Sequence, residues 1–333
     1  MGSLMEKQVG TMWATVQERY GPPAEVLRLR EIVKPAMGAG EVLVRIHATP
    51  VSGTDWHLMR GLPYAARFVT GLRRPKNLVP GYDMSGVVEA VDDDVTTFRP
   101  GDEVFGWGAG SYAEYASVPA GQLIVKPAGL TLAQAAAVPV AGFTALQAIR
   151  DKGELGVGQK VLITGASGGV GIYAVQIAKW LGAEVTAVCS TAKMGLVQSI
   201  GADHVIDYTR EHFADRGGRY DVIVDLYGNP TLSDCRRVLA PGGTLVCVGG
   251  TGGRWFMGVD RWLRWVLAGL FLRLSVRPLI HKDRREDLIT IKELVEAGNV
   301  TPVLDKMYPL DRAAEAIQYV TDGHARGQVV ITI

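Results

Sequence analysis

Short apolar runs separated by turn residues make up most of the first 135 residues of the chain. Residues 41–49, EVLVRIHAT, alternate between apolar and polar side chains, and SGVVEAV at 85–91 follows a glycine turn. A period of two is typical of strands that bury one face. We therefore predict an all-β unit with irregular loops for this part of the chain.

The pattern changes near residue 130, where residues 131–150 have a helical composition that is interrupted at Pro139 and Gly142. From Lys160 onward, short apolar runs alternate with longer segments that have an apolar face. Predicted strands cover 160–164, 184–189, 204–208, 221–225 and 243–249, and predicted helices cover 169–182, 192–200 and 230–239. This alternation is typical of parallel βαβ units, so we predict an α/β fold with a doubly wound parallel sheet. Two helices at 286–298 and 310–323 and a closing strand at 328–333 complete the chain.

Composition narrows the class of protein. A length of 333 residues suggests two domains, and 47% hydrophobic with 21% charged residues is ordinary for a globular protein. A net charge of +1 gives no indication of a nucleic-acid partner. Three scattered cysteines suit neither a disulfide framework nor a CxxC metal site, and the N-terminus lacks the apolar core of a secretory signal, so we expect a cytoplasmic protein.

Three glycines mark a candidate cofactor site at the junction of a predicted strand and a predicted helix. In GASGGVG, Gly165 permits a tight turn, Gly168 lets the backbone approach a pyrophosphate, and Gly171 lets the helix pack on the strand. A purely structural turn could use the same glycines. Because this turn opens an alternating βα unit, we predict dinucleotide binding.

The residues after the second predicted strand bear on which dinucleotide binds. An NAD site usually carries an acid there for the ribose 2′-hydroxyl, whereas residues 188–191 of this chain read VCST. Lys193 follows and Tyr208 ends the next strand, and an ammonium with hydroxyls suits a 2′-phosphate. The alternative is that Lys193 is a solvated residue at a helix start and Tyr208 a surface residue. We favour NADPH over NADH.

Seven segments carry a family resemblance: GDEVFG, AEYASVP, AAAVPVAGFTALQA, GASGGVG, GADHVIDY, LAPGGTLVCVG and HARGQVVITI. From about residue 12 to its C-terminus the chain resembles the medium-chain dehydrogenase/reductase superfamily, in the zinc-lacking, quinone oxidoreductase-like branch. The resemblance implies a GroES-like β domain with an inserted Rossmann domain. We place the GroES-like domain at 1–137, the Rossmann domain at 138–282, and the return to the GroES-like domain at 283–333. It also implies a homodimer paired through a Rossmann edge strand, here expected at 243–249.

The resemblance assigns cofactor contacts by position. Residues implied at the pyrophosphate are Gly165, Ser167, Gly168, Gly169, Val170 and Gly171. Residues implied at the 2′-phosphate are Ser190, Lys193 and Tyr208, and those near the nicotinamide are Thr144, Val248 and Gly249.

Zinc-dependent members of the superfamily use three protein ligands, and the resemblance locates all three positions. They correspond to Ser52 in VSGTDWH, Tyr82 in PGYDMSG and Val140 before AGFTALQA. A serine hydroxyl and a neutral phenol are poor zinc ligands and valine has no ligand atom, so we predict no zinc. Without that Lewis acid, hydride addition to an electron-poor quinone or α,β-unsaturated carbonyl is easier than oxidation of an unactivated alcohol. The neighbouring Asp55 and Asp83 are expected to brace loops or to pair with arginines such as Arg60.

Four residues are candidates for the chemistry. Thr54 and His57 hold positions that form a proton relay in zinc enzymes, and the alternative is a leftover loop pair. Tyr64 lies where quinone oxidoreductase relatives keep a tyrosine, which either hydrogen-bonds the substrate carbonyl or forms an aromatic wall. Tyr82 either donates to the acceptor oxygen or fills the space of the metal.

Residues 254–285 are unusual because eight basic and two acidic residues, a net charge of +6, surround a run of tryptophans and leucines. The longest uncharged run, 265–272, is too short to cross a membrane. One interpretation is a hydrophobic lid at 250–282 over the substrate site, with arginines facing solvent. The other is peripheral contact with a membrane surface. We favour the lid.

Three functions remain open. The leading hypothesis is an NADPH-dependent, zinc-independent reductase of a small hydrophobic quinone or conjugated carbonyl. The second is a metal-free, NADP-dependent alcohol or aldehyde oxidoreductase, which a working Thr54–His57 relay would favour. The third is a non-catalytic, NADPH-binding, membrane-associated protein.

Overall fold

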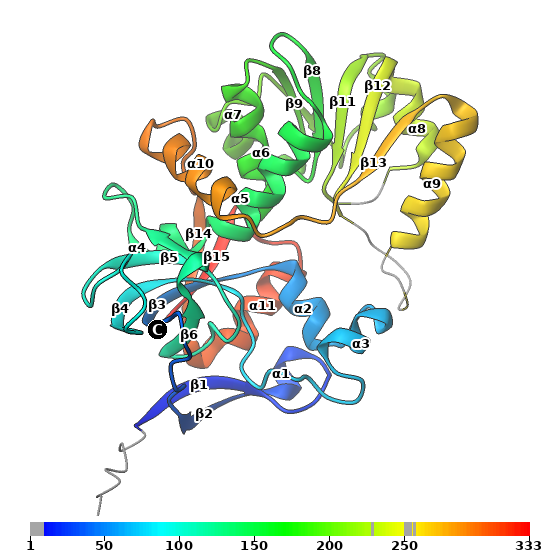
Figure 1. Cartoon of the computed structure of the whole chain (residues 1–333). Coiled ribbons are helices and arrows are strands. Elements are labelled where there is room, and N and C mark those ends of the chain that lie inside the picture. Colours follow the sequence, from blue (N-terminus) through cyan, green and yellow to red (C-terminus); the bar gives the residue numbers. More distant parts are fainter. Residues whose placement is uncertain (1–9, 228–229, 250–254, 256–257) are drawn as a thin grey trace, which may run out of the picture.

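The computed structural model describes residues 10–227, 230–249, 255 and 258–333, and it arranges them around two large sheets (Figure 1). The first domain, called the β domain, contains β1 (Thr11–Gln17), β2 (Leu27–Val33), β3 (Glu41–Val51), β4 (Asp83–Val91), β5 (Glu103–Trp107), β6 (Tyr115–Pro119), β7 (Leu123–Val125), β14 (Leu304–Pro309) and β15 (Gln328–Thr332). Its seven-stranded sheet has the order β14-β15-β3-β4-β5-β7 with β6 paired to β3, and β1 pairs with β2 separately.

Alternation of apolar and polar residues sets the register of the β domain. The pattern predicted for residues 41–49 is confirmed in β3, where Val42, Val44 and Ile46 are buried and Arg45 is exposed. The last strand, β15, pairs antiparallel with β3. The C-terminus of the chain therefore completes the sheet that the N-terminal part begins.

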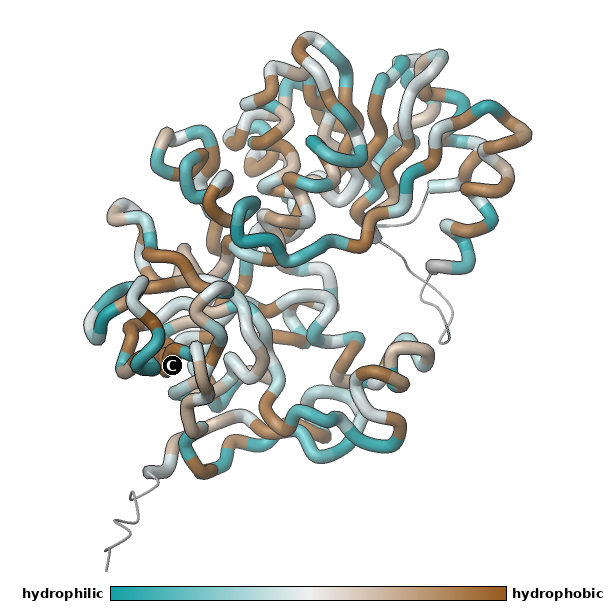
Figure 2. Tube along the Cα trace, in the orientation of Figure 1, coloured by the Kyte–Doolittle hydropathy of each residue, from teal (hydrophilic) through white to brown (hydrophobic). Residues whose placement is uncertain are grey.

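The second sheet contains β8 (Lys160–Thr164), β9 (Glu184–Cys189), β10 (His204–Asp207), β11 (Tyr220–Asp225), β12 (Leu239–Cys247) and β13 (Ser275–Pro278). All its neighbours are parallel and their order is β10-β9-β8-β11-β12-β13. Counted from β8, this is the 3-2-1-4-5-6 order of a Rossmann domain, so the predicted fold class is confirmed. Hydrophobic stretches run along these strands, as expected for a sheet covered on both faces (Figure 2). Its helices are α6 (Gly169–Trp180), α7 (Met194–Ser199), α8 (Leu232–Val238) and α9 (Val259–Leu272).

The prediction that residues 243–249 form the free edge of this sheet is wrong. They lie largely in β12, which is covered on its outer side by β13, with Leu245 opposite Val276. The segment SVRP gives a strand too short and too mixed in polarity to be recognised from an apolar run. The edge strands are therefore β13 and β10.

Residues 131–150 differ from the prediction at Gly142. Thr131 caps α4 (Leu132–Ala136), and Pro139 opens α5 (Pro139–Leu146), which continues as a π-helical turn, Gln147–Lys152. Gly142 lies inside α5 because Ile291 packs on it: a Cβ there would be 2.7 Å from the Ile291 Cδ1 atom. Pro139 therefore marks a boundary, whereas Gly142 marks a close approach of two helices.

The helix α10 (Arg285–Glu296) follows the expected boundary at 283 and carries Ile291 against α5. Its buried residues join a hydrophobic cluster that includes residues of the Rossmann sheet and of β5 and β7. Re-entry into the β domain occurs at β14, followed by α11 (Ala313–Thr321). The remaining helices of the β domain are α1 (Pro23–Val26), α2 (Gly53–Met59) and α3 (Arg67–Thr70). Within the described part of the chain, none of the helices combines the length and apolarity needed to cross a bilayer.

Candidate functional site

The glycine loop lies at the point where the order of the parallel strands reverses. It joins the end of β8 to α6, and Gly165 takes a φ of 65° that glycine adopts readily. A Cβ on Gly171 would lie 2.3 Å from the Gly165 carbonyl oxygen, so the helix packs this closely only because the residue is glycine. Backbone N–H groups at the start of this 12-residue helix are suited to bind an anion. The geometry fits a pyrophosphate.

The C-terminal strand braces this loop from the β domain. The backbone N–H of Gly327 donates to the Ser167 carbonyl at 3.1 Å, and Gln328 Nε2 donates to the Gly169 carbonyl at 3.2 Å. Ser167 is buried and Val170 is half-buried. Both domains therefore fix the position of the candidate pyrophosphate site.

The residues implied near the nicotinamide have groups already engaged in hydrogen bonds. The Thr144 hydroxyl donates to the Val140 carbonyl at 2.7 Å. The backbone N–H groups of Val248 and Gly249 both donate to the Asp225 carbonyl, at 2.9 and 3.1 Å. These residues shape the end of β11 and β12 through their backbone.

Sequence reasoning missed Asp225 at the end of β11. Its side chain is fully buried, and its carboxylate accepts hydrogen bonds from the Thr164 hydroxyl at 2.8 Å and from the Arg261 guanidinium at 3.3 Å. Arg261 belongs to α9, so this charge pair fastens α9 to the cofactor end of the sheet. An acid directly after a buried strand, DVIVD, was the available signal.

The three residues implied at the 2′-phosphate come from two neighbouring strand ends. Ser190 follows β9, and Tyr208 follows β10. The backbone N–H of Tyr208 donates to the Cys189 carbonyl at 3.1 Å, which joins the two strand ends. Lys193 Nζ donates to the Gly323 carbonyl at 2.8 Å, and burial lowers the pKa of this lysine. Lys193 is thus oriented by the β domain, while Tyr208 is 64% exposed.

An acid, Asp207, does lie beside the candidate 2′-phosphate site, but it is at the end of β10 and not at the end of β9. The Asp207 carboxylate accepts hydrogen bonds from the hydroxyls of Thr191 and Thr209, and it lies 3.5 Å from the Arg210 guanidinium. The Thr191 hydrogen bond is the main cause that holds the pKa of Asp207 below its usual range. The carboxylate therefore ties the two strand ends together, and Arg210 adds a cation that sequence reasoning missed.

The three positions that bind zinc in metal-dependent relatives have structural hydrogen bonds here. Ser52 caps α2: its hydroxyl accepts from the Asp55 backbone at 3.2 Å and donates to the Asp55 carboxylate at 2.8 Å. The Tyr82 hydroxyl donates to Asp283 at 2.6 Å, and the backbone N–H of Val140 donates to Asp83 at 2.9 Å. A capping serine, a neutral phenol and a valine do not fit zinc as a ligand set.

Two carboxyl groups, the half-buried Asp55 and the buried Asp83, form hydrogen bonds with these positions. Burial raises the pKa of Asp55, and it raises the pKa of Asp83 further, with the charges of Asp55 and Asp283 as additional causes. The prediction that Asp55 and Asp83 brace loops is confirmed by their bonds to α2 and α5. Arg60 lies over the Trp56 ring at 4.8 Å.

Tyr82 connects the β domain to the segment between β13 and α10. Asp283, which accepts its hydrogen bond, also lies 3.4 Å from His281 Nε2. Gln147 holds this segment through both of its amide atoms: Nε2 donates to the Lys282 carbonyl at 2.7 Å, and Oε1 accepts from the Lys282 N–H at 2.9 Å. A hydroxyl has a single proton, so Tyr82 in this arrangement cannot also donate to a substrate oxygen.

The other candidate catalytic residues lie on α2 and just before α3. Thr54 is exposed and His57 is one turn further along α2, on the same face. Burial, followed by the charge of Arg60, lowers the pKa of His57 to about 4, so the imidazole is neutral at pH 7. The Tyr64 ring packs edge-on against Trp255 with centroids 5.5 Å apart.

The structure describes only part of the predicted lid at 250–282 and its arginines, and Arg254 lies outside the described residues. The expected arrangement, with apolar side chains inward and arginines outward, is found only in part in α9. Trp262 and Trp265 are buried and Arg264 and Arg273 are exposed, but Arg261 turns inward to Asp225. Leu263, Leu267 and Phe271 are exposed.

A doubly wound parallel sheet with a glycine loop, joined to a mainly antiparallel β domain, is the architecture of a dinucleotide-binding oxidoreductase. Residues 38–128 match the family described as alcohol dehydrogenase GroES-like domain, and residues 200–331 match the family described as zinc-binding dehydrogenase. The chain is 32% identical to the chloroplast envelope quinone oxidoreductase homolog of Arabidopsis thaliana over 96% of this chain and 98% of that protein. It is 31% identical to the chloroplastic NADPH-dependent alkenal/one oxidoreductase of the same plant, over 96% of this chain and 79% of that protein.

Solved structures agree with these relatives. The structure of the quinone oxidoreductase from Coxiella burnetii superposes with a TM-score of 0.86 at 27% identity, covering 97% of this chain and all of that one. The chain belongs to the medium-chain dehydrogenase/reductase superfamily, in its quinone oxidoreductase-like branch.

Proposed function

We propose that this protein is an NADPH-dependent, zinc-independent reductase of conjugated acceptors, either quinones or α,β-unsaturated carbonyls. One observation carries the proposal: the glycine loop is intact, while the three metal-ligand positions are engaged in structural hydrogen bonds. The names of the two plant relatives, a quinone oxidoreductase homolog and an alkenal/one oxidoreductase, support the same acceptor classes.

The chain's residues would hold the cofactor at two groups, the pyrophosphate and the 2′-phosphate. The loop from Gly165 to Gly171 would bind the pyrophosphate through backbone N–H groups. Ser190 and Lys193 would bind the 2′-phosphate, since an ammonium that is already oriented loses little freedom on binding an anion. When bound, NADPH supplies the hydride.

A neutral imidazole in the candidate site suits an acceptor that needs one hydrogen-bond donor more than a metal. Burial lowers the pKa of His57 to about 4, so its imidazole is uncharged at pH 7, and burial raises the pKa of Asp83. Tyr82 is engaged by Asp283, whereas the Tyr64 hydroxyl has no hydrogen-bond partner among the residues that the structure describes. We assign Tyr64 as the donor to the acceptor oxygen.

A second function, metal-free oxidation of an alcohol or reduction of an aldehyde, is favoured by one observation. A neutral His57 can accept a proton, and Thr54 lies one helical turn away from it. In this reaction the two residues would carry the alcohol proton toward solvent.

The expected compartment and assembly also remain proposals. Three free, buried thiols, Cys189, Cys235 and Cys247, support a reducing compartment such as the cytoplasm. A homodimer that pairs Rossmann edge strands would use β13.

The deciding experiment follows NADPH oxidation with a panel of quinones, enones and aldehydes, with and without a metal chelator. We expect turnover of quinones or enones that the chelator leaves unchanged, and a higher KM with NADH. Loss of activity on chelation would contradict zinc independence, and activity confined to alcohols and aldehydes would select the second function. Tyr64→Phe should lower kcat, whereas the matched change Tyr115→Phe on β6, outside the candidate site, should not.

A further inference from the structure

The helix α9 has apolar side chains on two opposite faces. One face packs on the Rossmann sheet through Trp262 and Trp265, which are each only 8% exposed. The other face carries Leu263, Leu267, Leu270 and Phe271, which are 61%, 52%, 73% and 88% exposed. Their spacing of four, seven and eight residues places them in one stripe along the helix. A soluble surface helix ordinarily has polar residues there.

A second exposed apolar element lies in the β domain. Phe68 and Val69 on α3 are each 74% exposed, and Leu72, just after it, is 63% exposed. Contiguous exposed apolar side chains of this kind mark an interaction site more often than scattered single residues do.

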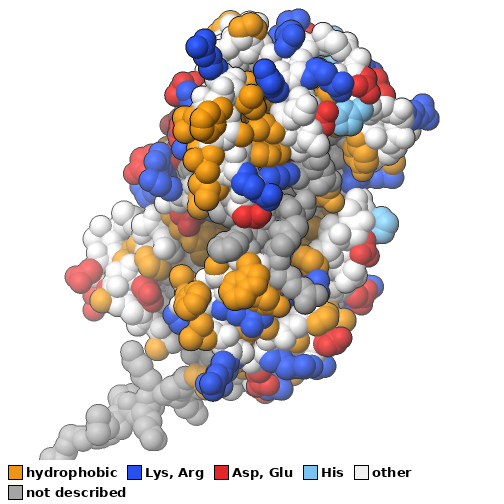
Figure 3. All heavy atoms as spheres, turned by 90° about the vertical axis from the view of Figure 1, so that its right-hand side faces the viewer, with side chains coloured by type: hydrophobic (Ala, Val, Ile, Leu, Met, Phe, Trp, Pro, Cys, Tyr) orange, Lys and Arg blue, Asp and Glu red, His pale blue; other side chains and the backbone are white. Residues whose placement is uncertain are grey.

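The residues that precede α9 and α3 contact each other through Trp255 and Tyr64. Trp255 stands three residues before the Gly258 cap of α9, and Tyr64 stands three residues before α3. Their rings meet edge-on at 5.5 Å, and the Ala65 N–H donates to the Trp255 carbonyl at 3.4 Å. Both helices consequently lie on one side of the molecule (Figure 1), and hydrophobic side chains gather on that side with Lys and Arg beside them (Figure 3).

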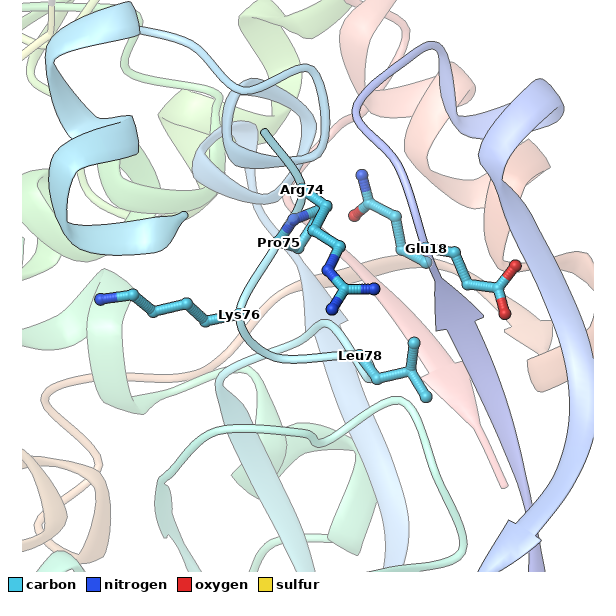
Figure 4. A pocket seen from close by; sticks show the side chains of 6 residues that line it. Glu18, Arg74, Pro75, Lys76 and Leu78 are labelled. Carbon is cyan, nitrogen blue, oxygen red and sulfur yellow. The ribbon is translucent and has the colours of Figure 1, made fainter. Parts of the chain in front are cut away.

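The charges on these elements are almost all positive. The exposed cations are Arg264 and Arg273 at α9 and Arg73, Arg74 and Lys76 after α3. Between 64 and 78 and between 259 and 274 the only acid is Asp260, which pairs with Arg264 at 2.8 Å. Arg74 and Lys76 also line a hollow of about 580 Å³ (Figure 4). Glu18 lines the same hollow, but its carboxylate forms an ion pair with Arg30.

We propose that α9 and the segment 67–76 form one docking surface for a membrane rich in anionic phospholipid. Leucine and phenylalanine side chains would enter the boundary between headgroups and acyl chains, while arginine and lysine would face the phosphates. A second copy related by two-fold symmetry would instead set these cations against one another, which opposes association. The surface borders Tyr64, so a lipid-soluble acceptor would reach the candidate site directly from the bilayer.

Flotation of the full chain with lipid vesicles tests this proposal. The probes are vesicles of phosphatidylcholine alone and vesicles in which about a third of the lipid is phosphatidylglycerol. We expect the protein to float with the anionic vesicles at low salt, and high salt to weaken binding. The double variant Leu267→Gln/Phe271→Gln should bind at least about 10-fold more weakly, and so should Arg73→Gln/Arg74→Gln.

A matched control changes exposed apolar residues elsewhere. Val157 is 86% and Met307 61% exposed, and neither lies on the docking surface, so Val157→Gln/Met307→Gln should bind like the unchanged protein. Thermal melting and turnover of a water-soluble quinone should be equal in all variants. Absence of binding to anionic vesicles, or equal binding by the Leu267/Phe271 variant, would overturn the proposal. Conversion of a dimer to a monomer by that same variant in sedimentation would assign the surface to a second copy.

Discussion

The phenol of Tyr82 donates a 2.6 Å hydrogen bond to the carboxylate of Asp283, 201 residues away along the chain. Tyr82 belongs to the β domain, and Asp283 lies on the segment that Gln147 of the α5 π-turn holds in place. The hydrogen bond therefore joins the position of a missing metal ligand to the Rossmann domain. It acts as a link between the domains, whereas a zinc ligand would face the substrate.

Replacement of Tyr82 by phenylalanine should weaken this link. We expect a loss of about 1 kcal/mol, below the usual value for a hydrogen bond to a charged group because both side chains are partly exposed to solvent. Burial acts to raise the pKa of Asp283, but hydrogen bonds from His281 and Tyr82 outweigh it and leave the pKa below its usual range. The stabilisation is thus present above about pH 4 and is lost as the pH falls through the lower folded value. Thermal midpoints of the two proteins should differ at pH 7 and converge as the pH falls below the lowered pKa of Asp283; equal midpoints at pH 7 would contradict the link.

The ring of His57 should titrate far below an ordinary histidine. Burial and the nearby Arg60 lower its pKa to about 4, so the folded protein stays neutral there while the unfolded chain takes up a proton below about pH 6.5. Stability should therefore fall as the pH drops from 6.5 toward 4. A titration of the ring followed by NMR should have its midpoint near 4, and the pH profile of kcat/KM between 5.5 and 8 should keep its shape in His57→Gln. A midpoint near 6.5 would show that the imidazole is solvated.

Addition of one methyl group at Gly171 should disrupt the cofactor loop. The Cβ would lie 2.3 Å from the Gly165 carbonyl oxygen and 2.6 Å from the Ala166 backbone, which cannot shift as a flexible side chain would. Overpacking of this kind costs about 1–3 kcal/mol, so Gly171→Ala should lower the thermal midpoint and weaken NADPH binding by about 10-fold or more. The control is Gly195→Ala in α7, where nothing lies within 4 Å of the new Cβ. That variant should be as stable as the parent, or more so, because alanine favours helix.

Loss of the Lys193 charge should affect one cofactor selectively. A charged hydrogen bond to the 2′-phosphate contributes about 1.5–3 kcal/mol, so Lys193→Gln should raise the Kd for NADPH about 10- to 100-fold. The Kd for NADH should change little, and Lys193→Arg should recover part of the NADPH affinity. Isothermal titration with both cofactors gives the measurement. An equal loss for the two would mean that Lys193 acts through its bond to Gly323 alone.

Local patterns predicted the elements that bury a regular apolar face. Alternation identified β3, buried apolar runs identified the parallel strands from β8 to β12, and the glycine spacing located the loop that the structure places at the reversal of strand order. The strand β13 escaped detection because SVRP has half-buried residues throughout and no apolar run.

Relationships between distant residues could not be predicted in this way. Local patterns predicted no helix at 259–272, and apolar side chains on two opposite faces of α9 do not show which face packs inward. The exposure of Phe271 and the inward turn of Arg261 therefore emerged only from the structure. The bonds of Tyr82 to Asp283 and of Lys193 to Gly323 depend on how the two domains meet, and nothing local encodes that distance.

The pairing of β15 with β3 has a consequence for synthesis of the protein. A ribosome releases β3 early, yet its partner β15, and the Gly327 and Gln328 contacts to the glycine loop, follow only after every strand of the Rossmann sheet. The nascent β domain must wait with an open sheet edge until β15 is made, exposed to aggregation or to a chaperone. Loss of β15 would leave β3 without this partner and the glycine loop without its contacts from the β domain.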